Sequence, residues 1–193
     1  MKANLSRNEL PEQYHLKIHI DMKANPAEFW GIQLGSLLLL IPFIFPIIWG
    51  WIPTLKDWDL VSNRQALIYV LLLQVPMMIA HEWLHGIVYK QGTDRKVVYK
   101  FHGFAASASV PGTYFYLRHY QRVGLAPAVV LNALFLVLTL ISSGQWQVVW
   151  YLMLAVHFAS CVGDFYVSLR IRTLPVDTLI EDYGVGMKVY VRQ

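Results

Sequence analysis

The feature that most constrains this chain is a long stretch without charge. Residues 123 to 163 include no Asp, Glu, Lys or Arg. A helix of that length would extend about 60 Å, and the hydrocarbon layer of a membrane is about 30 Å thick, so the stretch is long enough for two crossings. The segment SSGQ, residues 142–145, is the plausible turn within it. We therefore predict membrane spans at about residues 123–141 and 146–169.

Two further apolar segments precede this stretch. Residues 29–53 carry no charge, and Pro42 and Pro46 are expected to kink a helix there or to end it early. Residues 65–89 form a second segment long enough to cross a membrane. With 56% hydrophobic and 15% charged residues, the chain is too apolar for an ordinary soluble domain. We therefore predict a single membrane-embedded domain, residues 1–193, with four spans.

Positive charge is distributed unequally between the two sides of this four-span topology. All but two of the sixteen Lys and Arg residues lie in the N-terminal segment, the loop between spans two and three, and the C-terminal tail, which share one side. The other side has Lys56 and Arg64. The positive-inside rule then predicts a multi-pass cell-membrane protein with both termini in the cytoplasm. No basic cluster contains interleaved aromatic residues, so we expect no nucleic-acid partner.

Three segments outside the spans have the pattern of strands. Residues 15–22 and 187–192 alternate polar and apolar side chains, and residues 96–110 are mostly β-branched, aromatic or small. All three lie on the predicted cytoplasmic side. The predicted fold class is therefore an all-α membrane protein of about four transmembrane helices, with a small cytoplasmic β element.

The second predicted span carries the sequence HEWLH, which is an H-E-x-x-H motif. On a helix, His81 and His85 share a face and can offer two imidazoles to one metal ion, a geometry that suits zinc. Glu82, beside the first histidine, can act as a general base for water. The alternative is a group of interfacial histidines, with Glu82 extending to water.

Asp164 is the best candidate for a third metal ligand, which a catalytic zinc site usually needs. It is the first charged residue after the long neutral stretch. Counted from the cytoplasmic ends of their spans, His81 lies about 10 Å deep and Asp164 about 7.5 Å deep. The two depths agree. In the alternative, Asp164 begins the cytoplasmic tail and pairs with Arg170 or Arg172.

Two further polar residues fall within the spans. His157 belongs to a polar stripe on span four that includes Asp164, and such a stripe is expected to face the interior of a helix bundle. It could support a metal ligand, polarise a substrate carbonyl, or be a hydrogen-bonded packing residue. Asn132, in span three, could bind an oxyanion or a substrate backbone, or make an interhelical hydrogen bond.

The order of these motifs resembles the three-helix core of the site-2 proteases, which are intramembrane zinc metalloproteases. HEWLHG with a later Gly163-Asp164 is more closely similar to the zincin peptidases grouped as the family DUF3267, over roughly residues 70–190. The middle helix differs from the G-P-x-x-N pattern of site-2 proteases, since it reads LAPAVVLN. By this resemblance His81, His85 and Asp164 would bind Zn2+, Glu82 would be the catalytic base, and span one would be peripheral.

These observations predict a membrane zinc metallopeptidase that hydrolyses peptide bonds at or near the cytoplasmic face. Its substrate would be a peptide or a membrane protein, held in extended form, and residues 96–110 could pair with it as an added strand. One alternative is a non-proteolytic membrane protein with a structural zinc site, acting as a regulator or partner-binding module. A transporter with a midplane ion site is disfavoured, because the polar residues cluster near one face.

Overall fold

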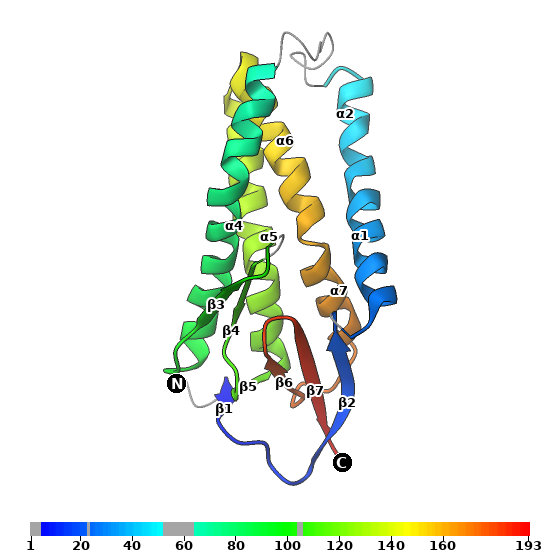
Figure 1. Ribbon diagram of the computed structural model, residues 1–193, viewed down its shortest axis with the longest axis vertical. Helices are drawn as coiled ribbons and strands as arrows, with labels where there is room; N and C mark the ends of the chain where they lie inside the picture. The colour runs from blue at the N-terminus through cyan, green and yellow to red at the C-terminus, as the bar shows by residue number, and fades with distance from the viewer. Residues whose placement is uncertain (1–4, 23, 52–63, 104–105) are drawn as a thin grey trace.

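The computed structural model describes residues 5–22, 24–51, 64–103 and 106–193. Within these ranges, four helical segments are long and apolar enough to cross a membrane. They stand side by side along the long axis of the molecule, and the strands gather toward one end (Figure 1). The segments are α1 to α2 (Pro26–Ile48), α4 (Arg64–Gly92), α5 (Leu117–Ile141), and α6 followed by α7 (Gly144–Ile171).

The first segment changes its helical form at the two prolines, as the sequence predicts. α1 (Pro26–Leu40) is followed by the short 3-10 helix η2 (Ile41–Ile44) and then by α2 (Phe45–Ile48). The Pro46 nitrogen has no hydrogen to donate to Phe43 in a 3-10 turn. The Tyr151 hydroxyl of α6 donates to the Phe43 carbonyl instead. The expected end of this span, residues 52 and 53, and Lys56 lie outside the described residues.

The last segment is interrupted, which was not expected from the sequence. α6 (Gly144–Ser160) ends directly before Cys161, and α7 (Val162–Ile171) begins directly after it. The Ser160 hydroxyl donates to the carbonyl of His157, 2.8 Å away. Such a side-chain bond to the preceding turn competes with the backbone ladder and bends a helix. Asp164 lies in the first turn of α7.

The prediction of an all-α fold was wrong. The chain forms a five-stranded antiparallel sheet in the order β1-β5-β6-β7-β2, and a separate two-stranded sheet of β3 and β4. The strands of the two sheets are β1 (Ser6–Arg7), β2 (Tyr14–Asp21), β3 (Val98–Phe101), β4 (Ala106–Ser109), β5 (Tyr114–Tyr116), β6 (Leu179–Asp182) and β7 (Gly186–Arg192). The segments predicted as strands correspond to β2, β3 with β4, and β7. The missed strands β1, β5 and β6 have only two to four residues each, too few to establish an alternating pattern.

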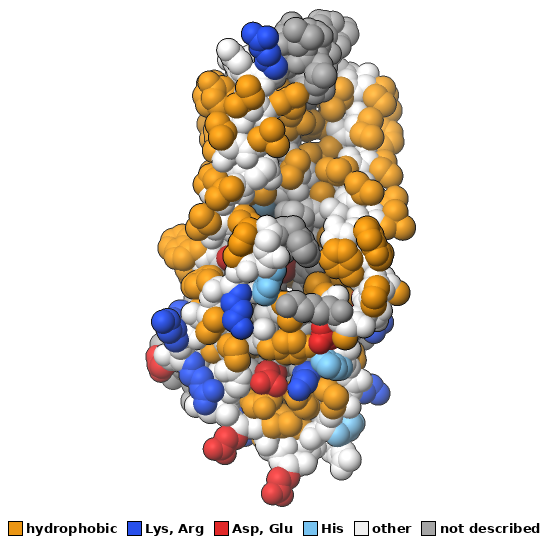
Figure 2. All heavy atoms as spheres, viewed as in Figure 1, with side chains coloured by type: hydrophobic (Ala, Val, Ile, Leu, Met, Phe, Trp, Pro, Cys, Tyr) orange, Lys and Arg blue, Asp and Glu red, His pale blue; other side chains and the backbone are white. Residues whose placement is uncertain are grey.

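Two apolar clusters hold the helices and the sheet together. One lies within the bundle and includes Leu131 and Phe135 of α5 and Met153 of α6. The other joins the sheet to the adjoining helix ends, with Phe115 of β5 and Tyr89 of α4 both at 1% exposure or less. Hydrophobic side chains cover the outer surface of the helices, whereas charged side chains gather at the strand end (Figure 2). This distribution is typical of a helix bundle surrounded by lipid.

Candidate metal and catalytic site

The two histidines of the H-E-x-x-H motif lie one turn apart on α4 and converge on one point. The Nε2 atoms of His81 and His85 are 3.1 Å apart. His85 is buried, and its Nδ1 lies 2.8 Å from the backbone oxygen of Val123 on α5. A carbonyl oxygen only accepts, so Nδ1 of His85 carries the ring hydrogen and Nε2 keeps its lone pair toward the site.

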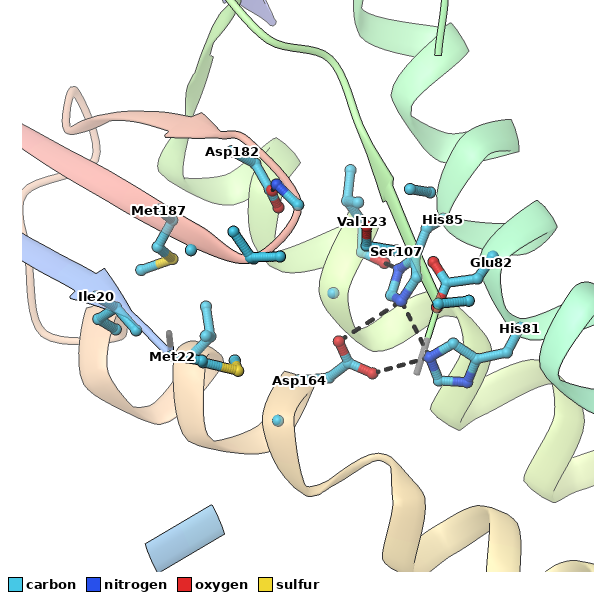
Figure 3. A pocket seen from close by; sticks show the side chains of 18 of the residues that line it. Ile20, Met22, His81, Glu82, His85, Ser107, Val123, Asp164, Asp182 and Met187 are labelled. Atoms are coloured by element: carbon cyan, nitrogen blue, oxygen red, sulfur yellow. Dashed lines mark hydrogen bonds and ion pairs between the residues drawn. The ribbon is translucent and has the colours of Figure 1, made fainter. Parts of the chain in front are cut away.

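Asp164 of α7 completes a group of three (Figure 3). Its Oδ2 lies 3.3 Å from Nε2 of His81 and its Oδ1 lies 3.5 Å from Nε2 of His85. The ion pairs of Asp164 in the described part of the chain are with these histidines rather than with Arg170 or Arg172. The alternative of Asp164 as the first residue of the tail therefore lacks support in the geometry.

The separations between the three donors suit a zinc ion. Zinc in proteins is bound tetrahedrally by His nitrogen and carboxylate oxygen at about 2.0–2.1 Å, which places neighbouring donors about 3.3–3.4 Å apart. The observed separations of 3.1, 3.3 and 3.5 Å lie around this value. Three protein donors also leave the fourth position of a tetrahedron available, as catalytic zinc sites do.

Glu82 lines the same cavity as the three donors. The cavity has a volume of about 350 Å³ and lies between α4, α7, β4 and the hairpin of β6 and β7. The backbone N–H of Ala108, in β4, faces the carboxylate of Glu82. Glu82 therefore lies next to the candidate metal donor His81 in the sequence and next to strand β4 in space.

Sequence reasoning missed the residues that fix the sheet over this cavity. Asp182, at the end of β6, accepts hydrogen bonds from the hydroxyls of Tyr89 and Tyr120, at 2.8 and 2.7 Å, and from the N–H of Gly184 at 2.7 Å. Burial raises the pKa of Asp182, and these donors oppose the rise. Nothing in the local sequence LIED distinguishes this carboxylate, since the two hydroxyls that donate to it come from α4 and α5.

The structure places His157 and Asn132 behind the site rather than in it. The described residues that line the cavity include neither of them. Nε2 of His157 lies 3.1 Å from Nδ1 of His81, and Nδ1 of His157 lies 2.7 Å from Oδ1 of Asn132. The geometry thus favours support of a metal ligand over direct substrate binding. His81, His157 and Cys161 form a second group whose donor atoms lie close together.

Comparison with known proteins identifies the family. Residues 74–179 match the family DUF3267, described as "Putative zincin peptidase". The match covers more than half of the chain, so the chain belongs to this family, as its motifs predicted. Membership implies a metallopeptidase with a zinc cofactor and a peptide substrate, and the donor set of His81, His85 and Asp164 fits zinc. No curated protein and no solved structure matches the chain.

Proposed function

We propose that the protein is an integral-membrane metallopeptidase of the H-E-x-x-H type, with His81, His85 and Asp164 as its zinc ligands and Glu82 as its catalytic base. The observation that carries this proposal is the convergence of three donor atoms at tetrahedral spacing in a cavity that Glu82 also lines. The group combines residues of α4 and α7, which are far apart in the sequence. Its three members are therefore brought together by the fold and not merely by the spacing within one helix.

The chemistry divides between the ion and the chain. Zinc, when bound, lowers the pKa of water and polarises a peptide carbonyl. Glu82 takes the proton from the attacking water and delivers it to the leaving amine. The backbone N–H of Ala108 faces the same carboxylate and can donate a hydrogen bond to it.

The outer edge of β4 supports an extended substrate beside this carboxylate. β4 pairs with β3 with Ala106 opposite Phe101 and Ala108 opposite Tyr99. Backbone groups in an antiparallel pair point alternately toward and away from the partner strand. Because the N–H of Ala108 is directed to Glu82, the outward backbone groups of β4 are those of Ala106 and Ala108. A peptide added at this edge would lie along the cavity.

The charge distribution supports cleavage near the cytoplasmic face. Charged side chains gather at the strand end, to which β2 and β7 bring the N-terminal and C-terminal parts of the chain (Figures 1 and 2). With the positive-inside rule, this end faces the cytoplasm and the hydrophobic surface of the helices contacts the lipid bilayer. A reporter fused to either terminus is then expected to fold and report from the cytoplasm.

A comparison of cells that differ only in the side chain at position 82 tests the proposal. Cells with the wild-type chain and cells with Glu82→Gln are compared by mass spectrometry of membrane-protein fragments. We expect uncut species to accumulate in the Glu82→Gln cells, together with loss of their fragments. Identical fragment patterns at equal protein levels would instead favour a structural zinc site in a non-proteolytic protein.

A further inference from the structure

A row of three side chains extends from the candidate zinc site into the centre of the bundle. His81 of α4 is followed by His157 of α6 and then by Asn132 of α5, with separations of 3.1 and 2.7 Å between their polar atoms. His157 is fully buried. Three helices thus each contribute one polar group to the same row, in a region where the neighbouring side chains are apolar.

The hydrogen positions along this row follow from the chemistry of the groups. A neutral imidazole carries one ring hydrogen, so His81 can hold a metal through Nε2 only if its Nδ1 bears the hydrogen. That Nδ1–H then donates to Nε2 of His157, which must accept. The hydrogen of His157 is therefore on Nδ1 and donates to Oδ1 of Asn132.

The side-chain oxygen of Asn132 sets the direction in which the hydrogen bonds of this row are donated. If its amide presented N–H to His157, both imidazoles would reverse, and Nε2 of His81 would carry a hydrogen directed at the metal donors. The other proposed histidine ligand, His85, needs no such row of side chains, because the backbone oxygen of Val123 already fixes its ring. His81 has no backbone acceptor of this kind among the contacts described. Its acceptor is instead the side chain of His157.

We propose that His157 and Asn132 are positioning residues that hold His81 in the tautomer and ring orientation that bind zinc through Nε2. This inference rests on the zinc site of the proposed function and adds two residues that touch neither metal nor substrate. Partners of this kind on metal-binding histidines change metal affinity about 10–100-fold when they are removed.

Cys161 offers a competing arrangement, since its sulfur could join His81 and His157 around a metal. The distances argue against it. The sulfur lies 3.9 Å from Nδ1 and 3.8 Å from Nε2 of His157. Nearly equal distances to the two ring nitrogens place the sulfur away from the lone-pair direction of Nε2. Cys161 therefore packs against the ring instead of sharing a ligand position with it.

The test measures metal binding by the full-length protein in detergent, with zinc affinity from chelator competition and the visible spectrum of the cobalt-substituted protein. Asn132→Leu removes the acceptor at similar volume, and we expect zinc affinity to fall about 10–100-fold with a changed cobalt spectrum. Asn132→Asp keeps an acceptor and should restore both. His157→Leu should weaken binding similarly, and Asn132→Leu added to it should have little further effect, because the two residues act in series.

Thr139→Val is the matched control, because Thr139 is a buried polar residue of α5 that bonds within its own helix. It should leave zinc affinity unchanged. Unchanged zinc affinity in Asn132→Leu, with a normal melting temperature of the metal-free protein, would overturn the proposed row. A thiolate-to-cobalt charge-transfer band that disappears in Cys161→Ala would place the metal in the competing group and overturn it too. A wild-type chain that binds no zinc would overturn the site itself, and the row with it.

Discussion

Oδ2 of Asp164 lies 3.3 Å from Nε2 of His81, although the two residues belong to different helices and lie far apart in the sequence. Asp164 lies in the first turn of α7, directly after the interruption of the last helical segment at Cys161. Replacement of Asp164 therefore tests the proposed zinc site directly.

Asp164→Ala should remove most of the zinc. A change in a hydrogen-bonding partner of a metal ligand costs about 10–100-fold in affinity, so the loss of a ligand should cost more than about 100-fold. Zinc per chain is measured by elemental analysis after dialysis. Asp177→Ala, which changes an acidic residue outside the cavity lining, should retain zinc. Equal zinc in the two variants would exclude Asp164 as a ligand.

Proline at the outer edge of β4 should block substrate binding without loss of metal. Ala106→Pro removes an outward N–H that an added strand would use, and leaves the β3 to β4 ladder intact. We expect peptide cleavage to fall about tenfold, by analogy with the loss of one or two substrate hydrogen bonds. Phe101→Pro makes the same change on the far edge of β3, and should cleave normally. The idea fails if both variants cleave alike.

Gly186→Ala should destabilise the sheet next to the cavity. A Cβ atom at this position would meet the backbone oxygen of Ile20 and the Tyr183 side chain, and a backbone atom cannot move aside cheaply. We expect a loss of about 1–3 kcal/mol, measured as a lower melting temperature in detergent. Gly31→Ala is the control, because nothing lies within 4 Å of its added Cβ. A melting temperature unaffected by Gly186→Ala would contradict this packing.

The stability conferred by Asp182 should depend on pH. Burial raises its pKa in the folded chain above the ordinary value of 3.8, so the folded chain binds more protons than the unfolded chain between the two values. The free energy of unfolding should therefore decrease as the pH rises from about 4 through the folded-state pKa. Asp182→Asn lacks this effect, and its melting temperature relative to wild type should rise with pH. A difference that stays constant with pH would show that the pKa of Asp182 is not raised.

The sequence predicted the helices well because their signal is compositional. A span needs only length and apolar side chains, and residues 123–163 satisfy both without regard to partners. The spacing of His81 and His85, and the depth of Asp164, likewise depend on helical geometry that a sequence reveals. The three side chains lie close together in the structure.

The sheet and the supporting contacts could not be predicted in the same way. β5 and β6 are short and gain their stability from pairing with strands distant in sequence, so their own residues carry little signal. Asp182 is defined by hydroxyls from α4 and α5, and Asn132 by a histidine of α6. Such roles are set by tertiary contacts. The same limit led to the incorrect all-α class.

The most direct test of the proposed function is cleavage of unfolded peptides by the purified, zinc-loaded protein, followed by mass spectrometry, with Glu82→Gln as the comparison. Zinc content should be equal in the two proteins, because Glu82 is not among the converging donors. We expect the wild-type chain to cleave and Glu82→Gln to be slower by about 10²–10⁴-fold, the usual contribution of a general base. Equal rates at equal zinc content would contradict it.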